Sequence, residues 1–427
     1  MNKRIISTVC MAALVLMTNA QSGTNSPYSQ YGLGILSDQS LGFNRGMSGV
    51  GLGVRKGNIV NTLNPASYSA VDSLTMMFDV GLSGQITNFK EGNVKVNANN
   101  SNFEYAVGSF RLLPSVGVSF GVLPYSNIGY NYYSEQRLEL TQQTITDTHT
   151  GEGGLHQAFI GAGWRILKPL SVGFNIAYMW GTYNRSVSSS STSSINSLTK
   201  SYYGTVNSYN LEFGLQWQQQ LSRKDELTIG ATVGIGHKLG CDANCEILDI
   251  NSQTAVTDTT LFTIKNGLEI PMTYGLGLAW NHSNRWLVAA DFCLQQWGSV
   301  KYPYFDGNIK DYVLRDDMLK DRYKVNVGAD FVPQPMSRRF LNRVHYRFGA
   351  GYTTPYYKIN GADGPREISV SAGLGIPLQN AYNNRSLLNV SAQWVRTSAK
   401  DLITENTFRI NIGLTFNERW FMKWRID

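Results

Sequence analysis

The sequence predicts an all-β protein, a transmembrane antiparallel β-barrel of about fourteen strands with an N-terminal periplasmic plug in its lumen. Composition is the first of three observations that support this fold class. The 427 residues include 42 Gly, 9 Trp, 23 Tyr and 18 Phe, and only 16% are charged, against about 25% in ordinary soluble domains. Beyond the N-terminus no stretch approaches the ~18 apolar residues of a membrane-spanning helix, and 42% hydrophobic residues exclude a disordered chain.

The first twenty residues have the pattern of a secretory signal peptide. Lys3 and Arg4 precede the apolar run 5–17, and Thr18-Asn19-Ala20 supplies small residues for cleavage. The mature chain is therefore expected to begin near Gln21.

Strict period-2 alternation is the second observation. In 227–235 and in 408–416, large apolar residues occupy one face while small or polar residues occupy the other. The same pattern predicts strands near 74–88, 102–112, 115–133, 153–166, 169–186, 203–221, 225–239, 266–281, 285–297, 320–332, 341–354, 366–378, 386–398 and 407–416.

The connections between these strands are the third observation, because short and long ones alternate. Residues 113–114 and 282–284 are short connections, whereas 187–202 and 240–265 are long. Outer-membrane barrels have short periplasmic turns and long outer loops, together with tilted strands longer than those of globular proteins. We therefore assign 74–416 to the barrel and 417–427 to a C-terminal tail.

Residues 21–73 lack this alternation and are assigned to the plug. Glycines recur in 32–34 and 46–53, but no strand precedes them, so they do not form a dinucleotide-binding fingerprint. Small residues allow close backbone packing inside a narrow lumen. We expect this segment to add no strand to the barrel, and it ends in the motif Asn64-Pro65-Ala66.

A signal peptide, a plug ending in Asn64-Pro65-Ala66 and fourteen strands together resemble the FadL-like family of outer-membrane transporters for long-chain fatty acids and aromatic hydrocarbons. The opening 26–29 and the tail 417–420 resemble a Bacteroidetes-type branch of this group. The resemblance implies a plugged lumen and a hydrophobic ligand that leaves sideways through the barrel wall. The eleven-residue tail departs from the family pattern, and no family ligand pocket aligns with this chain.

The third predicted strand contains Pro124, followed by Tyr125 and Ser126. Proline cannot donate to the strand ladder, so we expect a bulge here and a neighbouring carbonyl without a strand partner. These three residues are candidates for a lateral opening, which the resemblance places in the third strand. A kink at the outer rim without a role in transport is the alternative.

Several charged residues fall on the inward face by parity. They could capture a ligand carboxylate or hold the plug, but pairing with one another in a polar interior is the interpretation that we favour. The residues are Glu104, Arg165, Glu212, Asp291, Asp330, Arg347 and Arg409.

Cys241 and Cys245 lie in a predicted outer loop and are candidates for a local disulfide rather than a metal site, since no nearby histidine completes a ligand set. The five histidines are scattered, and none adjoins a serine motif, so the sequence predicts neither an enzyme nor a bound metal or cofactor. The net charge of +7 falls to +5 without Lys3 and Arg4 of the predicted signal peptide, and this mild charge argues against nucleic-acid binding, which usually shows clustered Lys and Arg.

We therefore expect a passive transporter in the bacterial outer membrane that carries small hydrophobic molecules, fatty-acid-like or aromatic, through the barrel wall. The alternative is a non-transporting barrel that acts as a scaffold or as an accessory to secretion or surface display. The expected partners are outer-membrane lipid, a hydrophobic ligand and, during biogenesis, the barrel-assembly machinery.

Overall fold

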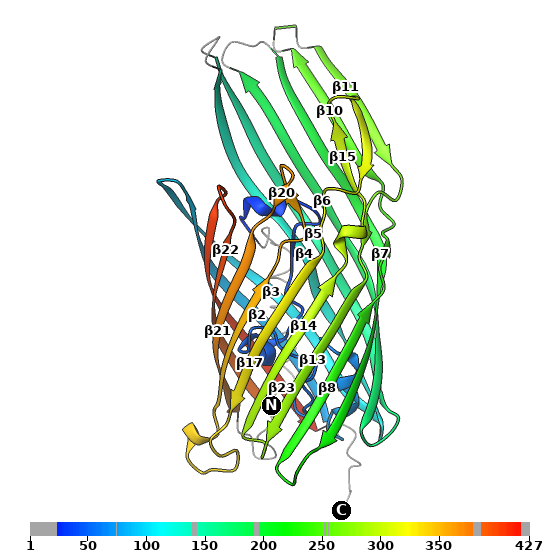
Figure 1. The fold of residues 1–427 in the computed structure, drawn as a ribbon, viewed down its shortest axis with the longest axis vertical. Coiled ribbons are helices and arrows are strands. Elements are labelled where there is room, and N and C mark those ends of the chain that lie inside the picture. The colour runs from blue at the N-terminus through cyan, green and yellow to red at the C-terminus, as the bar shows by residue number, and fades with distance from the viewer. Residues whose placement is uncertain are drawn as a thin grey trace, which may run out of the picture.

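The computed structural model describes residues 24–73, 75–138, 143–191, 196–251, 253–254, 256–378 and 386–419. Within this part of the chain, fourteen antiparallel strands form a closed barrel, in which the last strand pairs with the first (Figure 1). This confirms the predicted fold class. The barrel strands are β2 (Thr75–Glu91), β3 (Val94–Leu113), β4 (Val116–Leu138), β5 (Gln143–Arg165), β6 (Leu170–Ser191), β7 (Asn196–Gln220), β8 (Asp225–Gly234), β13 (Thr273–His282), β14 (Trp286–Gln295), β17 (Arg322–Phe331), β18 (His345–Thr353), β21 (Arg366–Leu378), β22 (Ser386–Ser398) and β23 (Thr404–Arg419).

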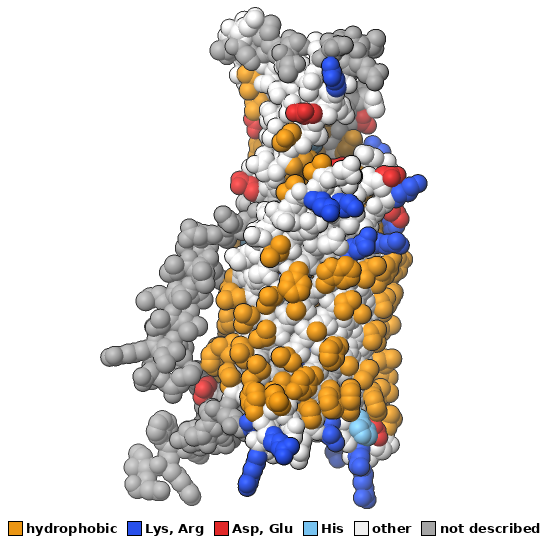
Figure 2. Space-filling view, turned by 90° about the vertical axis from the view of Figure 1, so that its left-hand side faces the viewer, with side chains coloured by type: hydrophobic (Ala, Val, Ile, Leu, Met, Phe, Trp, Pro, Cys, Tyr) orange, Lys and Arg blue, Asp and Glu red, His pale blue; other side chains and the backbone are white. Residues whose placement is uncertain are grey.

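The alternation seen in the sequence separates the outer face of the barrel from the inner face. In β13, Leu276 and Leu278 are 59% and 51% exposed, while Gly275 and Gly277, which alternate with them, are buried. Figure 2 shows the resulting belt of hydrophobic side chains around the lower part of the barrel. In the part of the chain that the structure describes, no helix has the length and apolar character to cross a membrane.

Four neighbouring strands, β4 to β7, continue far above this belt and form a tall wall on one side (Figure 1). β10 (Ala243–Asn251) pairs with the upper part of β7, and β11 (Val256–Ile264) pairs with β10. Residues 187–202 and 240–265, predicted as long connections, are thus largely strand. Clear apolar alternation is missing from these ranges: polar residues predominate in 187–191 and 196–202, and adjacent apolar residues such as Ile247 and Leu248 interrupt the pattern in β10.

Smaller elements complete the upper end. Two short pairs, β9 (His237–Lys238) with β12 (Glu269–Ile270) and β19 (Lys358–Ile359) with β20 (Ala362–Asp363), accompany the hairpin of β15 (Tyr302–Asp306) and β16 (Asp311–Arg315). Two single-turn helices are η3 (Trp297–Ser299) and η4 (Phe340–Asn342).

The ends of the chain differ from the expected boundaries in one respect. The last strand continues to Arg419, three residues beyond the predicted end at Phe416, because it pairs with the start of β2 at Thr75. The predicted signal peptide, 1–20, and residues 420–427 of the predicted tail lie outside the described residues.

Residues 24–73, which we call the N-terminal segment, lie inside the barrel (Figure 1). The segment contains η1 (Pro27–Gln30), β1 (Ile35–Leu36), α2 (Gly42–Arg45) and η2 (Pro65–Ala70). Most of its side chains are buried, and they pack against inward-facing residues from around the barrel. The segment therefore supplies the apolar centre that the inner wall itself lacks.

Candidate functional site

Glycines on the inner wall let the backbone of the N-terminal segment touch the barrel. A Cβ atom at Gly230 would overlap the carbonyl oxygen of Leu52, and one at Gly349 would overlap the backbone of Met47. At these two positions the close approach of the N-terminal segment leaves no room for a side chain on the wall.

Polar contacts hold the segment at fixed positions along the wall. Asp291 accepts hydrogen bonds from the backbone N–H groups of Gly51 and Leu52 at 2.6 and 2.9 Å. Arg45 forms a buried ion pair with Glu104 at 2.9 Å. Lys56 pairs with Asp330 at 2.8 Å, and Asp330 also contacts Arg347 and His345.

The motif Asn64-Pro65-Ala66 starts the helix η2. The side chain of Asn64 accepts from the N–H of Ala66, while its amide donates to the carbonyls of Leu52 and Leu215 at 2.9 and 3.1 Å. Asn64 therefore joins two parts of the N-terminal segment to β7.

The remaining predicted inward charges also lie inside the barrel. Arg165 donates to the carbonyl of Ser69 at 3.4 Å, and Glu212 accepts from Asn175 at 3.2 Å. Arg347 donates to Asn389 at 2.6 Å, and its guanidinium lies over the ring of Phe43.

Arg409 donates to Gln85 at 2.9 Å and lines the large cavity described below. These predicted charges do not converge on one site, because most are distributed along the contact with the N-terminal segment.

The wall opens between β3 and β4. These strands pair only from Ala106 with Val122 to Leu113 with Val116, at the end of the barrel with the short turns. Above this point β3 stays with β2, while β4 stays with β5. The β4–β5 pairing has a register shift between Pro124 and Ser126, so the predicted bulge is present at the place where β3 departs.

The N-terminal segment covers the exposed edge of β4. Ile35 and Leu36 pair with Asn127 and Ser126, so β1 does add a short strand, and the expectation that residues 21–73 add none was wrong. Pairing compensates for the strand partner that β3 no longer provides.

Two further bonds continue this cover beyond β1. Ser37 N–H donates to Tyr125 O at 2.9 Å, and Gln39 Nε2 donates to Pro124 O at 2.8 Å. The carbonyl beside the bulge, expected to lack a strand partner, is thus satisfied by a plug side chain.

A cavity of about 1430 Å³ lies behind this opening. Its lining includes inward-facing Glu104 and Arg409, and also Leu82, Ile86 and Ile410, which belong to the outward apolar face. The cavity therefore reaches from the lumen to the outer surface of the wall, and its volume exceeds the 300–1,000 Å³ of typical small-molecule sites.

The lumenal side of this cavity is polar and carries both signs of charge. Arg322 and Lys324 line it together with Glu367 and Glu405. Asp38 belongs to the same wall: burial opposes its ionisation, but Lys324, Arg45 and a hydrogen bond from Ser40 N–H hold its pKa at about 2.

An aromatic cluster borders the cavity, and Tyr28 and Tyr356 belong to both. Tyr28 and Leu33 of the N-terminal segment meet Tyr130, Trp297 and Tyr356 there.

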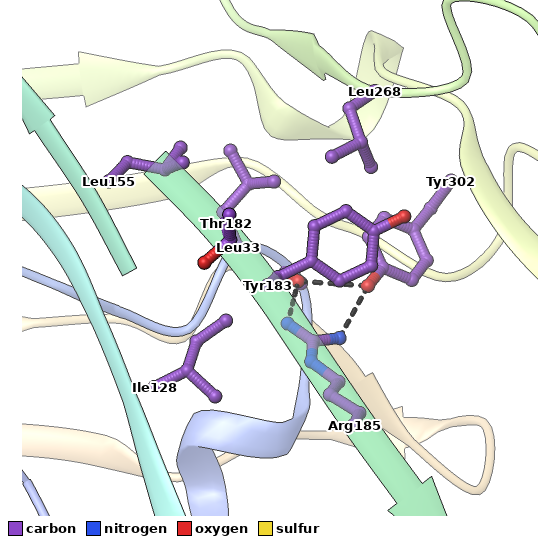
Figure 3. A pocket seen from close by; sticks show the side chains of 9 residues that line it. Leu33, Ile128, Leu155, Thr182, Tyr183, Arg185, Leu268 and Tyr302 are labelled. Atoms are coloured by element: carbon purple, nitrogen blue, oxygen red, sulfur yellow. Dashed lines mark hydrogen bonds between the residues drawn. The ribbon is translucent and has the colours of Figure 1, made fainter. Parts of the chain in front are cut away.

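Buried Arg185 lies at the side of this cluster (Figure 3), where it donates to Tyr302 Oη and to Gly32 O at 2.5 and 2.6 Å. The neighbouring cavity, about 10 Å³, is no larger than a water molecule. Packed side chains therefore leave no room for a ligand in this pocket beside Arg185.

The candidate disulfide is absent, since Cys241 and Cys245 are both free and buried. Cys241 packs into the upper aromatic cluster, whereas Cys245 lies under Tyr312 at the β15–β16 hairpin. Cys241 precedes β10 and Cys245 lies within it, and the two side chains enter different clusters. Burial raises the pKa of Cys241 to about 12 and that of Cys245 to about 11.

Sequence reasoning missed the residues of the N-terminal segment that cover the opening. Ile35, Leu36 and Gln39 form part of no motif, and their role depends on contacts with a strand almost ninety positions away. The proline itself was the only local indication of the site.

Comparisons with known proteins agree on the fold. The toluene transporter TodX of Pseudomonas putida matches with a TM-score of 0.63 at 14% identity, over 90% of this chain and 100% of that one. The toluene transporter TbuX of Ralstonia pickettii matches with a TM-score of 0.60 at 12% identity, over 90% and 99%. A FadL homologue of Pseudomonas aeruginosa matches with a TM-score of 0.59 at 9% identity, over 90% and 99%.

These likenesses confirm the FadL-like resemblance at the level of the fold, which is that of Gram-negative outer-membrane transporters. Among curated proteins no relative matched. A family model described as BamG matches residues 1–427. Because that match spans the whole sequence, the chain belongs to the BamG family, with a barrel of the FadL-like fold.

Proposed function

We propose that this protein resides in the outer membrane and lets small hydrophobic molecules move between its lumen and the surrounding lipid through the opening between β3 and β4. The observation that carries this proposal is the cavity of about 1430 Å³ that continues from the polar lumen to outward-facing Leu82 and Ile86. Transfer of a hydrophobic ligand from the polar lumen to lipid is favourable, because its apolar surface is removed from water.

The packing of the lumen supports a sideways route. The N-terminal segment packs its buried apolar residues against the inner wall, and the aromatic cluster around Tyr28 and Trp297 narrows the lumen beside the cavity. The edge of β4 is covered by short stretches of the N-terminal segment, through Ile35, Leu36, Ser37 and Gln39 and, further along, Ser29, and not by a full strand.

Uptake of a hydrophobic fluorescent tracer by cells that express the full chain tests the proposal. Ser101 lines the cavity on β3, so Ser101→Trp is expected to obstruct it and reduce uptake. Asn97→Trp, on the same strand but outside the cavity lining, is the matched control. Equal uptake by both variants at equal surface levels would contradict the lateral route.

Membership of the BamG family favours a second candidate, an accessory barrel of the barrel-assembly machinery. The tall wall of β4 to β7 with β10 and β11 also suits this role, since it presents a large surface above the membrane belt (Figure 1). In this role the aromatic cluster inside the barrel would serve stability rather than transport.

One complementation experiment separates the two candidates. Cells that lack the protein are examined for the amounts of folded outer-membrane barrels and for tracer uptake, and then supplied with Ser101→Trp. Restored barrel amounts without restored uptake would show that assembly does not need the opening. If deletion leaves barrel amounts unchanged and lowers only uptake, the accessory role is excluded.

A further inference from the structure

The connection between β17 and β18, residues 332–344, is the feature from which we draw a further inference. It lies at the end of the barrel that carries the short turns, and it extends outward from the barrel (Figure 1). It was expected to be short, from 333 to 340. Other connections at this end are shorter, namely 114–115, 166–169, 221–224 and 283–285.

Internal hydrogen bonds give this loop a defined shape. Gln334 N–H donates to Asn342 O at 2.8 Å, and the Asn342 side chain donates to Ser337 Oγ at 3.3 Å. The helix η4 occupies the turn between them. The loop therefore presents its side chains in a fixed arrangement.

A hydrogen bond joins the loop to the outward side of β18. Tyr346 is on the outward side of β18, next in that row to Phe348, and its hydroxyl donates to Leu341 O at 3.2 Å. Nearby, Trp286 and Phe331 stack with ring centroids 4.1 Å apart. Aromatic residues of this kind mark the boundary between hydrocarbon and headgroups.

The loop exposes apolar and basic side chains together. Met336 is 94% exposed, Leu341 67% and Phe340 48%. Arg338 and Arg339 are also exposed, and among the described residues neither forms an ion pair with an acidic side chain. Figure 2, which views this side of the barrel, shows Lys and Arg side chains below the lower border of the hydrophobic belt.

We propose that residues 332–344 bind the membrane leaflet at this end of the barrel. Met336, Phe340 and Leu341 then lie in the part of the acyl region next to the headgroups, and Arg338 and Arg339 contact headgroup phosphates. Apolar side chains gain by burial at this boundary, while arginine reaches the phosphates with bidentate hydrogen bonds. The contact from outward-facing Tyr346 favours lipid over a protein partner, because that side of the wall faces the membrane.

Polarity at the loop tests the insertion directly. Leu341→Cys is labelled with an environment-sensitive dye in the full chain, reconstituted in nanodiscs of phosphatidylcholine with one quarter phosphatidylglycerol. Ser222→Cys, in an exposed short turn at the same end, is the matched control. We expect blue-shifted emission from the dye at 341 and quenching by brominated lipid chains, with neither effect at 222.

The headgroup contact has its own test. Replacing phosphatidylglycerol by phosphatidylcholine alone is expected to lower the unfolding temperature of the native chain. In Arg338→Gln/Arg339→Gln this dependence should become clearly smaller, since each arginine near an anionic surface changes lipid binding roughly fivefold. Lys265→Gln/Lys310→Gln, at exposed positions of the opposite end, should retain it.

Each outcome decides the proposal. A water-like emission at 341 in nanodiscs, with both double variants responding alike to phosphatidylglycerol, would overturn it. If the dye at 341 were water-exposed in nanodiscs but protected in intact outer membranes, the loop would bind a protein partner, which also contradicts the lipid proposal.

Discussion

Gln39 of the N-terminal segment donates a hydrogen bond from Nε2 to the carbonyl oxygen of Pro124 in β4, at 2.8 Å. The same side chain accepts from Gln157 of β5 at 2.6 Å, so one residue spans the bulge where β3 departs. In hydrocarbon a backbone carbonyl without a partner costs several kcal/mol. The plug and the opening are therefore coupled through this contact.

Gln39→Ala is expected to destabilise the barrel by about 1–3 kcal/mol, because it leaves the Pro124 carbonyl without a donor. It should also raise tracer uptake, since the cover of the β4 edge is weakened. Gln219→Ala, on the exposed end of β7, is the control and should change neither value. Urea unfolding in lipid vesicles and uptake in cells measure the two effects. Lower stability with unchanged uptake would show that the contact between Gln39 and Pro124 does not control passage through the opening.

Pro124→Val is expected to have the opposite effects. Valine restores an N–H group at the point where β3–β4 pairing stops, so pairing can continue beyond Ala106 and Val122. The unfolding temperature should rise and tracer uptake should fall. Pro377→Val, in the paired strand β21, is the control for a proline removed elsewhere in the wall. A variant with longer β3–β4 pairing but normal uptake would exclude the opening as the route.

The barrel could be predicted from sequence because its two faces differ at every second residue. Leu276 and Leu278 face outward, whereas Gly275 and Gly277 face inward. Such alternation, in strands longer than those usual in globular proteins, indicates a membrane barrel and not a soluble sandwich. The upper parts of β6, β7 and β10 escaped prediction because they lie above the belt, where neither face must be apolar.

Only one residue of the candidate site could be predicted from the sequence, the proline that interrupts a predicted strand. Pro124 indicated a bulge, and the structure has one. The partners of the bulge, Ile35, Leu36 and Gln39, arrive from a distant segment whose path through the lumen no local pattern encodes. The predicted Cys241–Cys245 disulfide was wrong for a similar reason. The spacing of the two cysteines in the sequence does not reveal that each thiol is buried in a different cluster.

Gly230→Val is expected to disrupt the seat of the N-terminal segment. Its side chain would occupy the space of the Leu52 backbone, and overpacking of this kind costs about 1–3 kcal/mol or displaces the segment. Gly84→Val is the control, because a Cβ at Gly84 has no atom within 4 Å. Limited proteolysis of the N-terminal segment, together with thermal unfolding, measures both consequences. Equal protection in the two variants would show that the segment tolerates movement away from β8.

The thiols of Cys241 and Cys245 are expected to resist maleimide at pH 7.5 in the folded protein. Burial raises their pKa values to about 12 and about 11, so the reactive thiolate is scarce and also inaccessible. Thr259→Cys, exposed on β11, should react at once and serves as the control. After unfolding without reductant, both native thiols should react. Labelling that needs a reductant first would reveal a disulfide and contradict the structure.

The last prediction concerns insertion of the outward apolar face into lipid. Leu276→Arg, near the middle of β13, should cost about 2–4 kcal/mol of folding free energy in vesicles, because the charge would face hydrocarbon. Leu261→Arg is a matched control, since Leu261 is also exposed, at 58%, but lies on β11 above the belt. There the arginine meets water, so its cost should stay within about 0.5 kcal/mol. Heat-modified migration on gels and urea unfolding in vesicles both report the difference. Equal effects of the two substitutions would mean that the belt around β13 does not face lipid.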